Sequence, residues 1–65
     1  MRIFKWQMFK TREEARAFQK EKGYGVFHDL ECEAKRKSYD SITFYEVSEE
    51  TRKEYPFSVE WTEFI

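Results

Sequence analysis

Cysteine, proline and glycine are scarce in this sequence of 65 residues. It holds one cysteine, Cys32, so no internal disulfide can form. One proline and two glycines leave no flexible or proline-rich linker. No apolar run is long enough for a signal peptide or a membrane span. These absences predict a single domain over residues 1–65 that folds in a reducing cytoplasm and has no membrane partner.

Aromatic and charged residues are abundant. Seven Phe, four Tyr and two Trp make up 20% of the chain, and 38% of its residues are charged. A chain this short buries only about 60% of the surface that its unfolded form exposes. Each aromatic ring can bury about 150–250 Å², so we expect most of the rings in the core of a soluble domain. The net charge of −1 favours neither a dedicated nucleic-acid binder nor a nucleic-acid mimic.

The first third of the chain carries a strand signal and a helix signal. Residues 2–9 alternate with period two, which places Phe4, Trp6 and Met8 on one side of a strand. Thr11 and Glu14 have the spacing of a capping box, in which the Thr11 hydroxyl accepts from the Glu14 amide and the Glu14 carboxylate reaches back. The spacing predicts a helix over residues 12–22 that ends at a left-handed glycine, Gly23.

Residues 26–65 are divided in the same way. Alternation of apolar and polar residues predicts strands, and runs of Ser, Asp and charged residues predict turns and loops. Ser48 followed by acidic residues predicts a short helix that Pro56 ends. The predicted elements are a strand over 26–32, an exposed hairpin loop over 33–41, a strand over 42–47, a short helix over 49–55 and a strand over 57–65.

The predicted order is β-α-β-β-(short α)-β, which defines an α+β fold. Its simplest arrangement is a small antiparallel sheet of three to four strands, covered on one face by one main helix. This is either a ferredoxin-like plait or a simpler β-α-β-β-β sheet. The second helix is short, so the opposite sheet face is expected to stay partly open. That face is predicted to carry Ile3, Phe9, Phe27, Tyr45 and Val47.

The sequence contains no arrangement that predicts catalysis, a metal or a cofactor. On a strand, His28 and Cys32 would lie roughly 13 Å apart at about 3.3 Å per residue, too far for one Zn²⁺. The two glycines form neither a dinucleotide fingerprint nor a phosphate loop. His28 is the only histidine, and no activated nucleophile accompanies it. We therefore expect a protein that is not an enzyme.

The open sheet face is the first candidate binding site. Its candidate partner-binding residues are Ile3, Tyr45 and Val47, because exposed apolar patches on small proteins tend to mark interfaces. A homodimer or another protein partner would cover them. The alternative is that the second short helix, or Phe64 and Ile65, folds over the patch and gives an ordinary two-sided core.

A basic loop is the second candidate binding site. Lys35, Arg36 and Lys37 are consecutive and Tyr39 follows, so the loop is able to contact phosphates and stack on a base. The chain lacks the glycine- and aromatic-rich third-strand signature of single-stranded RNA readers. A run of three cations is also typical of a solvated loop. Nucleic-acid binding is therefore the alternative to protein binding.

Two segments carry a resemblance to other proteins. Residues 9–23, FKTREEARAFQKEKG, and residues 55–63, YPFSVEWTE, make up about a third of the chain. They resemble small uncharacterised proteins encoded by phages and mobile elements of Gram-positive bacteria. The resemblance implies an accessory phage product in the bacterial cytoplasm, a class that includes inhibitors of host or defence proteins. Neither segment carries a catalytic or binding residue, so the expected function is a non-enzymatic protein-binding module of unknown target.

Overall fold

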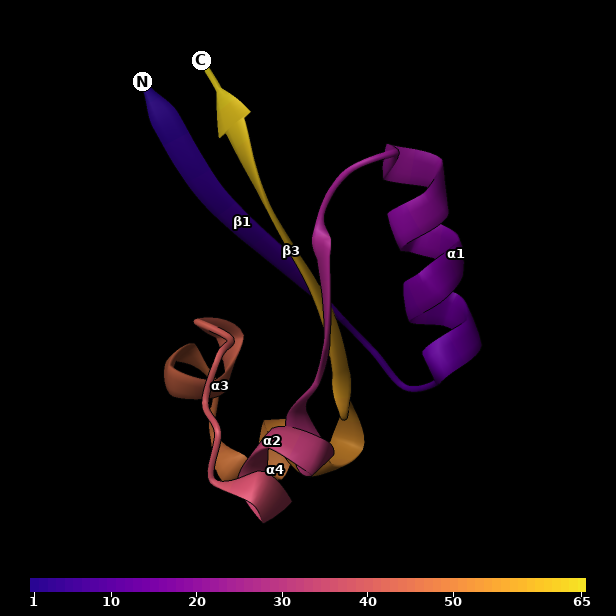
Figure 1. The fold of residues 1–65 in the computed structure, drawn as a ribbon, viewed down its shortest axis with the longest axis vertical. Coiled ribbons are helices and arrows are strands. Elements are labelled where there is room, and N and C mark those ends of the chain that lie inside the picture. Colours follow the sequence, from indigo (N-terminus) through magenta and orange to yellow (C-terminus); the bar gives the residue numbers. More distant parts are fainter.

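The computed structural model describes residues 1–65 as a small α+β fold with a three-stranded antiparallel sheet and several helices (Figure 1). No helix combines the length and the apolar character that crossing a membrane requires. The elements are β1 Arg2–Phe9, α1 Arg12–Lys22, β2 Val26–Asp29, α2 Leu30–Arg36, α3 Thr43–Glu46, α4 Glu49–Glu54 and β3 Phe57–Phe64.

The sheet has the strand order β1-β3-β2, so the last strand of the chain is the central one. β1 pairs with β3 along its whole length, from Arg2 opposite Phe64 to Phe9 opposite Phe57. β2 pairs with only four residues of β3, between Phe57 and Glu60. One end of the sheet is therefore a two-stranded ribbon, and the two chain termini lie side by side at that end (Figure 1).

The first strand and helix have the bounds that the sequence predicts. The Glu14 amide donates to Thr11 Oγ1 over 3.2 Å, and the helix ends at Gly23 with φ of 74°. The Gly23 amide donates to the carbonyl of Gln19. The reverse hydrogen bond, from the Thr11 amide to the Glu14 carboxylate, is not formed. One half of the predicted capping box is therefore enough to start α1.

The apolar core lies between α1 and one face of the sheet. Phe18 of α1 lies with its ring centroid 5.2 Å from that of Phe9 and 5.3 Å from that of Trp61. Ala15 and Val59 are fully buried beside these rings. Aromatic packing against a small helix residue thus fixes α1 on the sheet. The core cluster is Phe9, Ala15, Val59 and Trp61, with Phe18, Phe27 and Phe57 packed against it.

The prediction of which strand face is covered is wrong. Ile3, Phe9 and Phe27 were expected on the open face but lie on the α1 side, because they share a face with Val59 and Trp61 in the observed register. The period-two pattern separates the two sides of a strand but does not say which one a helix covers. The face away from α1 carries Phe4, Trp6 and Met8 of β1.

The second strand is shorter than predicted, and a helix replaces the predicted hairpin loop. β2 ends at Asp29, whose carboxylate accepts from the Cys32 amide over 3.0 Å and so caps α2. The helix ends at Lys37, which has φ of 56°. The sequence does contain a helix signal here: an Asp at the N-cap, acidic residues in the first turn and cations in the last turn. The apparent alternation of residues 26–32 led to the prediction of a strand instead.

The predicted strand over residues 42–47 is also wrong, because Thr43–Glu46 forms the short helix α3. The sheet therefore has three strands, and the four strands of a ferredoxin-like plait are not formed. Ser41 Oγ accepts from the Phe44 amide over 3.3 Å at the start of this turn. The β-branched and aromatic composition of the segment is overridden by contacts with the rest of the fold.

The end of the chain follows the prediction closely. The Ser48 side chain accepts from the Thr51 amide over 3.2 Å and caps α4, which ends at Glu54, two residues before Pro56. β3 follows over Phe57–Phe64. Figure 1 shows α2, α3 and α4 gathered at the end of the sheet opposite the two termini. The face away from α1 is therefore covered at one end only.

Candidate functional site

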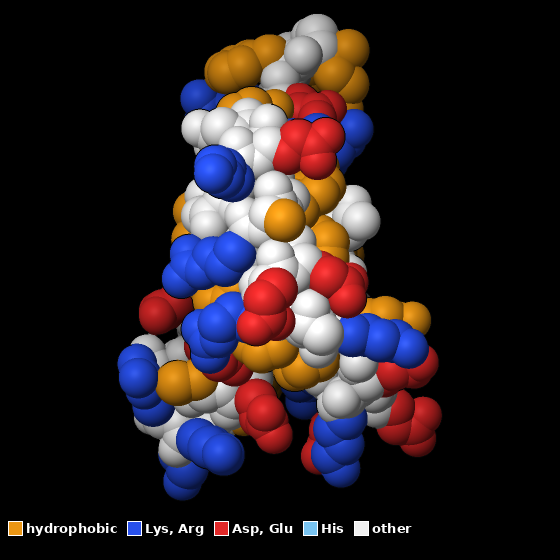
Figure 2. Space-filling view, turned by 90° about the vertical axis from the view of Figure 1, so that its right-hand side faces the viewer, with side chains coloured by type: hydrophobic (Ala, Val, Ile, Leu, Met, Phe, Trp, Pro, Cys, Tyr) orange, Lys and Arg blue, Asp and Glu red, His pale blue; other side chains and the backbone are white.

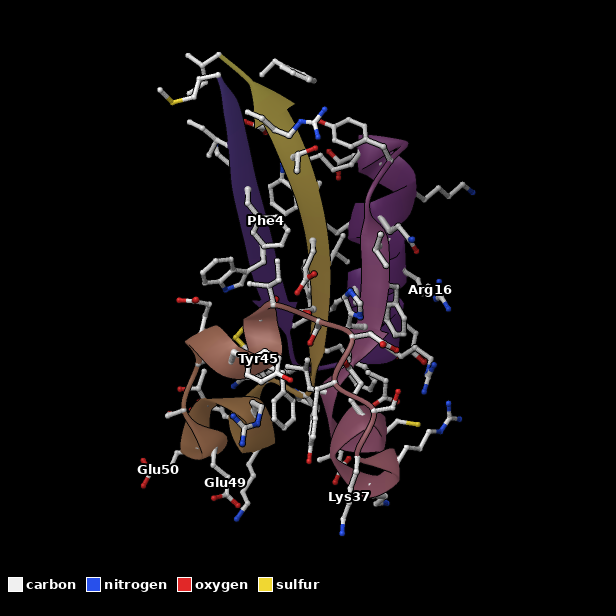
Figure 3. All side chains as sticks on the ribbon, turned by 60° about the vertical axis from the view of Figure 1, so that its left-hand side comes forward. Phe4, Arg16, Lys37, Tyr45, Glu49 and Glu50 are labelled. Carbon is white, nitrogen blue, oxygen red and sulfur yellow. The ribbon has the colours of Figure 1, made fainter.

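The uncovered half of the sheet face away from α1 is the candidate functional site. We call it the open face and define it by Phe4 and Trp6 of β1, Val26 of β2 and Thr62 of β3. The register places these residues on one side of the sheet. Figure 3 shows Phe4 on a part of the sheet that no helix crosses. Phe4 is 37% exposed and Val26 is 57% exposed, so large apolar side chains face solvent here.

The open face contains a shallow hollow of about 330 Å³. Phe4 lines one side of it, and Tyr24 and Val26 line another. The Phe4 and Trp6 rings lie 6.2 Å apart, so they form a continuous aromatic border. A hollow of this kind has room for one apolar or aromatic side chain.

Few charges lie on the open face. Arg2 shares the side of β1 with Phe4, and its guanidinium lies 5.1 Å from the ring centroid of Phe64. Glu60 is on the same side of β3 but is buried, and its carboxylate is engaged by other groups. The exposed side chains of the open face are therefore mostly apolar, with the hydroxyl of Thr62 among them and one cation at the margin.

The covered half of the same face holds a buried polar cluster around Glu60. Glu60 Oε2 accepts from both the amide and the hydroxyl of Thr43, over 2.7 and 2.6 Å. Glu60 Oε1 lies 3.2 Å from His28 Nε2. Because one carboxylate contacts both β2 and the first residue of α3, it holds this helix against the sheet.

Glu33 of α2 forms the other half of the cluster. Its Oε1 accepts from the amides of Asp40 and Ser41 over 2.8 Å each, which fixes the turn after α2. Its Oε2 lies 3.7 Å from His28 Nδ1 and accepts no hydrogen bond. His28 thus stands between two carboxylates, one from a helix and one from a strand.

The arrangement around His28 connects elements and does not activate a nucleophile. Ser58 lies opposite His28 in the sheet, but its hydroxyl is buried and has no hydrogen-bond partner. A serine nucleophile would need a hydrogen bond to the imidazole and access to substrate. No group of three or more His, Cys, Asp or Glu side chains is placed to hold a metal ion.

The sequence drew attention to His28 but did not predict that Glu33 and Glu60 are buried on either side of it. Glu33 was assigned to an exposed loop and Glu60 to the polar side of the last strand, yet both are buried. One signal was available in the sequence. Glu60 lies between Ser58 and Thr62, on the face away from the apolar residues of β3, and this could have indicated a second buried layer on that face. Cys32 lies in α2 beside a hollow of about 550 Å³ that His28 also lines.

The three predicted partner-binding residues do not share a sheet face. Ile3 lies in β1 on the α1 side, opposite Glu63. Tyr45 lies in α3 and is 68% exposed, and Val47 follows α3 and is half-buried. Figure 3 shows Tyr45 on the helix below the part of the sheet that carries Phe4. Tyr45 is therefore near the boundary of the covered half, not on a strand.

The predicted nucleic-acid residues lie at the far end of α2. Lys35 and Arg36 occupy its last turn and Lys37 its C-cap, where cations favourably meet the helix dipole. The Tyr39 ring packs against Phe44 with centroids 4.7 Å apart. Figure 2 shows Lys and Arg side chains interspersed with Asp and Glu on the face in view, with no large patch of one sign.

No protein-family model, no curated protein and no solved structure matches this chain.

Proposed function

We propose that this chain is a protein-binding module that contacts its partner through the open face. The observation that supports this most directly is the exposed apolar hollow bordered by Phe4, Tyr24 and Val26. Contiguous apolar surface on a small protein marks interaction sites, and aromatic residues contribute most of the binding energy at interfaces. Tyr45 extends the contact at the border of the covered half, while Ile3 and Val47 lie outside it.

Nucleic-acid binding is the second candidate, because Phe4 and Trp6 on an uncovered antiparallel sheet also suit base stacking. Such a site needs cations along the path of the phosphates. The open face has only Arg2 at its margin. Lys35, Arg36 and Lys37 are at the C-terminal end of α2, at the other end of the sheet, and Tyr39 is engaged with Phe44. Protein binding therefore agrees better with the distribution of charge.

The resemblance of residues 9–23 and 55–63 to phage and mobile-element proteins suggests where the partner is found. On this proposal the chain acts in the cytoplasm of a Gram-positive host, without a cofactor, and modulates or inhibits a host or defence protein. A small domain with an exposed apolar surface on a hydrogen-bonded sheet suits such a role, because a surface formed before binding loses little entropy on binding.

The experiment that tests the proposal is affinity capture from lysate of a Gram-positive bacterium, treated with nuclease and analysed by mass spectrometry. Phe4→Ser removes the central ring of the open face, and Lys20→Ser changes an exposed residue of α1 as the matched control. We expect one protein that wild type and Lys20→Ser both capture and that Phe4→Ser binds at least about tenfold more weakly.

Two results would contradict the proposal. Equal capture by Phe4→Ser and wild type would exclude the open face as the binding surface. Loss of capture on nuclease treatment would favour nucleic acid, and neutralising Lys35, Arg36 and Lys37 would then have to abolish binding. A Tyr45→Ser variant shows whether the surface extends onto α3.

A further inference from the structure

The outer edge of β1 has backbone groups without partners. Met1 and Ile65 exchange both backbone hydrogen bonds, over 3.0 and 2.9 Å, so they form a hydrogen-bonded pair. In an antiparallel ladder such pairs alternate with pairs that make no hydrogen bond. The amides and carbonyls of every second residue therefore point away from β3, and no other group in the structure bonds to them. These residues are Arg2, Phe4, Trp6 and Met8.

This edge lacks the features by which proteins prevent strands from pairing. Short edge strands, prolines, bulges and unpaired charges are the usual protections. β1 is eight residues long, contains no proline and keeps an unbroken register with β3. The one charge in its middle is Lys5, whose ammonium lies 2.9 Å from the Glu63 carboxylate. The charge that would repel a neighbouring strand is therefore compensated within the chain.

We propose that two copies of this chain pair antiparallel along β1 and form one continuous six-stranded sheet. The outward backbone groups of one copy must face those of the other copy, and in both copies they belong to every second residue. The two-fold axis therefore passes through a residue and not between two residues. An axis at Lys5 would set two lysines directly opposite each other, which is destabilising. An axis at Phe4 sets no like charges directly opposite each other.

The register centred on Phe4 pairs residues 2–6, in which Arg2 and Phe4 are exposed and Trp6 is half-buried, and it leaves the half-buried Met8 unpaired. It places Phe4 opposite Phe4 of the second copy. It also places Arg2 opposite Trp6 of the second copy, which allows a cation-π contact. Arg2, Phe4 and Trp6 all have outward backbone groups, so each of the three facing pairs exchanges two hydrogen bonds.

Pairing at the edge leaves the open face uncovered and joins two copies of it into one larger surface around the central phenylalanines. The dimer goes beyond the proposed function. If the protein bound its partner through Phe4 as a monomer, the dimer would be wrong and the proposed function would still hold. A contact of five paired residues on each chain is at the small end of interface sizes, below about 1,200 Å², so we expect a dimer that dissociates at micromolar concentrations.

Sedimentation equilibrium from about 1 µM to about 1 mM tests the proposal, a range that spans weak association. We expect the mass to rise from 8.1 kDa toward twice that value. Phe4→Pro removes an amide that has no partner in the single chain, so it should keep the fold and stay monomeric. Lys5→Pro is the matched comparison, since it removes an amide that bonds to β3 and should weaken the fold itself.

Hydrogen exchange gives a readout that does not depend on a variant folding. The amides of Arg2, Phe4 and Trp6 should become protected as the concentration rises, while the amide of Lys5 should be protected throughout. A mass of 8.1 kDa over the whole range, with outward amides that exchange freely, would overturn the dimer. A dimer that survives Phe4→Lys, which opposes two ammonium groups at the axis, would overturn the register centred on Phe4.

Discussion

The two faces of the sheet are stabilised by different physical means, and alternate residues of the same strand supply both. Val59 and Trp61 of β3 point into an apolar layer that α1 closes. Ser58 and Glu60 point into a layer of carboxylates, imidazole and hydroxyl that α2 and α3 cover at one end. Nondirectional burial holds α1, whereas directed hydrogen bonds supplement the burial of Leu30 in holding the short helices.

This difference explains why one half of the second face stays open. Only five hydrophobic residues of this chain are buried, because a chain this short buries a small share of its surface and completes only one apolar layer. Glu60 and Glu33 position short helices by a few specific contacts, which reach only the end of the sheet where His28 lies. The remaining part of the face is left apolar and exposed, and it is the part through which we propose that a partner binds.

Removing an aromatic ring from the apolar layer should cause the largest loss of unfolding free energy. Phe9→Ala removes a ring that packs 5.2 Å from Phe18, and it should lower the free energy of unfolding by about 3–5 kcal/mol. Urea denaturation followed by tryptophan fluorescence measures this loss. Phe64→Ala is the control, because Phe64 is 76% exposed and its change should stay within about 0.5 kcal/mol. Equal effects at the two positions would show that the assignment of the core is wrong.

Gly25→Ala should cause the next largest loss of unfolding free energy, because its methyl group enters space beside the same apolar layer. A Cβ there would lie 3.1 Å from Val59 Cγ1, and the residue has φ of 120°. Backbone strain and overpacking should together lower the unfolding free energy of Gly25→Ala by about 2–4 kcal/mol.

Gly23→Ala separates backbone strain from overpacking. Gly23 also has positive φ, but a Cβ there meets no atom within 4 Å, so only strain of about 1–2 kcal/mol is expected. Thermal unfolding of both variants gives the comparison. A larger loss for Gly23→Ala than for Gly25→Ala would contradict the close contact between Gly25 and the apolar layer.

The apolar layer is the part of the fold that the sequence predicts best. The Thr11 cap, the Gly23 terminus and the period-two pattern of β1 and β3 are local signals that the structure confirms. Capping and alternation are decided by residues a few positions apart, so one sequence is enough to recognise them. The side of β1 that α1 covers is not local information, and it was predicted wrongly.

The polar layer could not be predicted in the same way. Residues 42–47 have the composition of a strand, yet Thr43 bonds to Glu60, seventeen positions along the chain, and the segment forms α3. Asp29 was recognisable as a helix cap, but the alternation before it was extended through Cys32. Contacts between distant polar residues leave no periodic trace, so the cluster was missed and the partly open face was assigned the wrong residues.

A smaller effect is expected from removing one hydrogen bond of the polar layer. Thr43→Val keeps the shape of the side chain but deletes the hydroxyl that donates to Glu60 Oε2 over 2.6 Å. The unfolding free energy should fall by about 1–3 kcal/mol, because a buried carboxylate loses a donor.

Thr62→Val makes the same change at an exposed position of β3 and is the matched control, expected within about 0.5 kcal/mol of wild type. Urea denaturation of both variants measures the difference. If Thr43→Val is as stable as Thr62→Val, the buried hydrogen bond does not hold α3 on the sheet.

The smallest expected effect concerns Glu63, a polar contact at the solvent-exposed rim of the apolar layer. The hydrogen bond from Trp61 Nε1, and then that from Lys5, hold the pKa of the Glu63 carboxyl below its ordinary value. A lowered folded-state pKa contributes stability that is complete above the unfolded-state pKa and is lost as the pH falls through the folded-state pKa. Trp61→Phe keeps most of the buried ring but deletes the donor, so the pKa of Glu63 should rise toward its ordinary value.

NMR titration of the Glu63 side-chain carboxyl measures this shift in a buffer of low ionic strength. Lys5→Met is the comparison and should also raise the pKa of Glu63, since it removes both a hydrogen bond and a nearby positive charge. If Lys5→Met moves the pKa more than Trp61→Phe does, the ammonium and not the indole dominates at this rim.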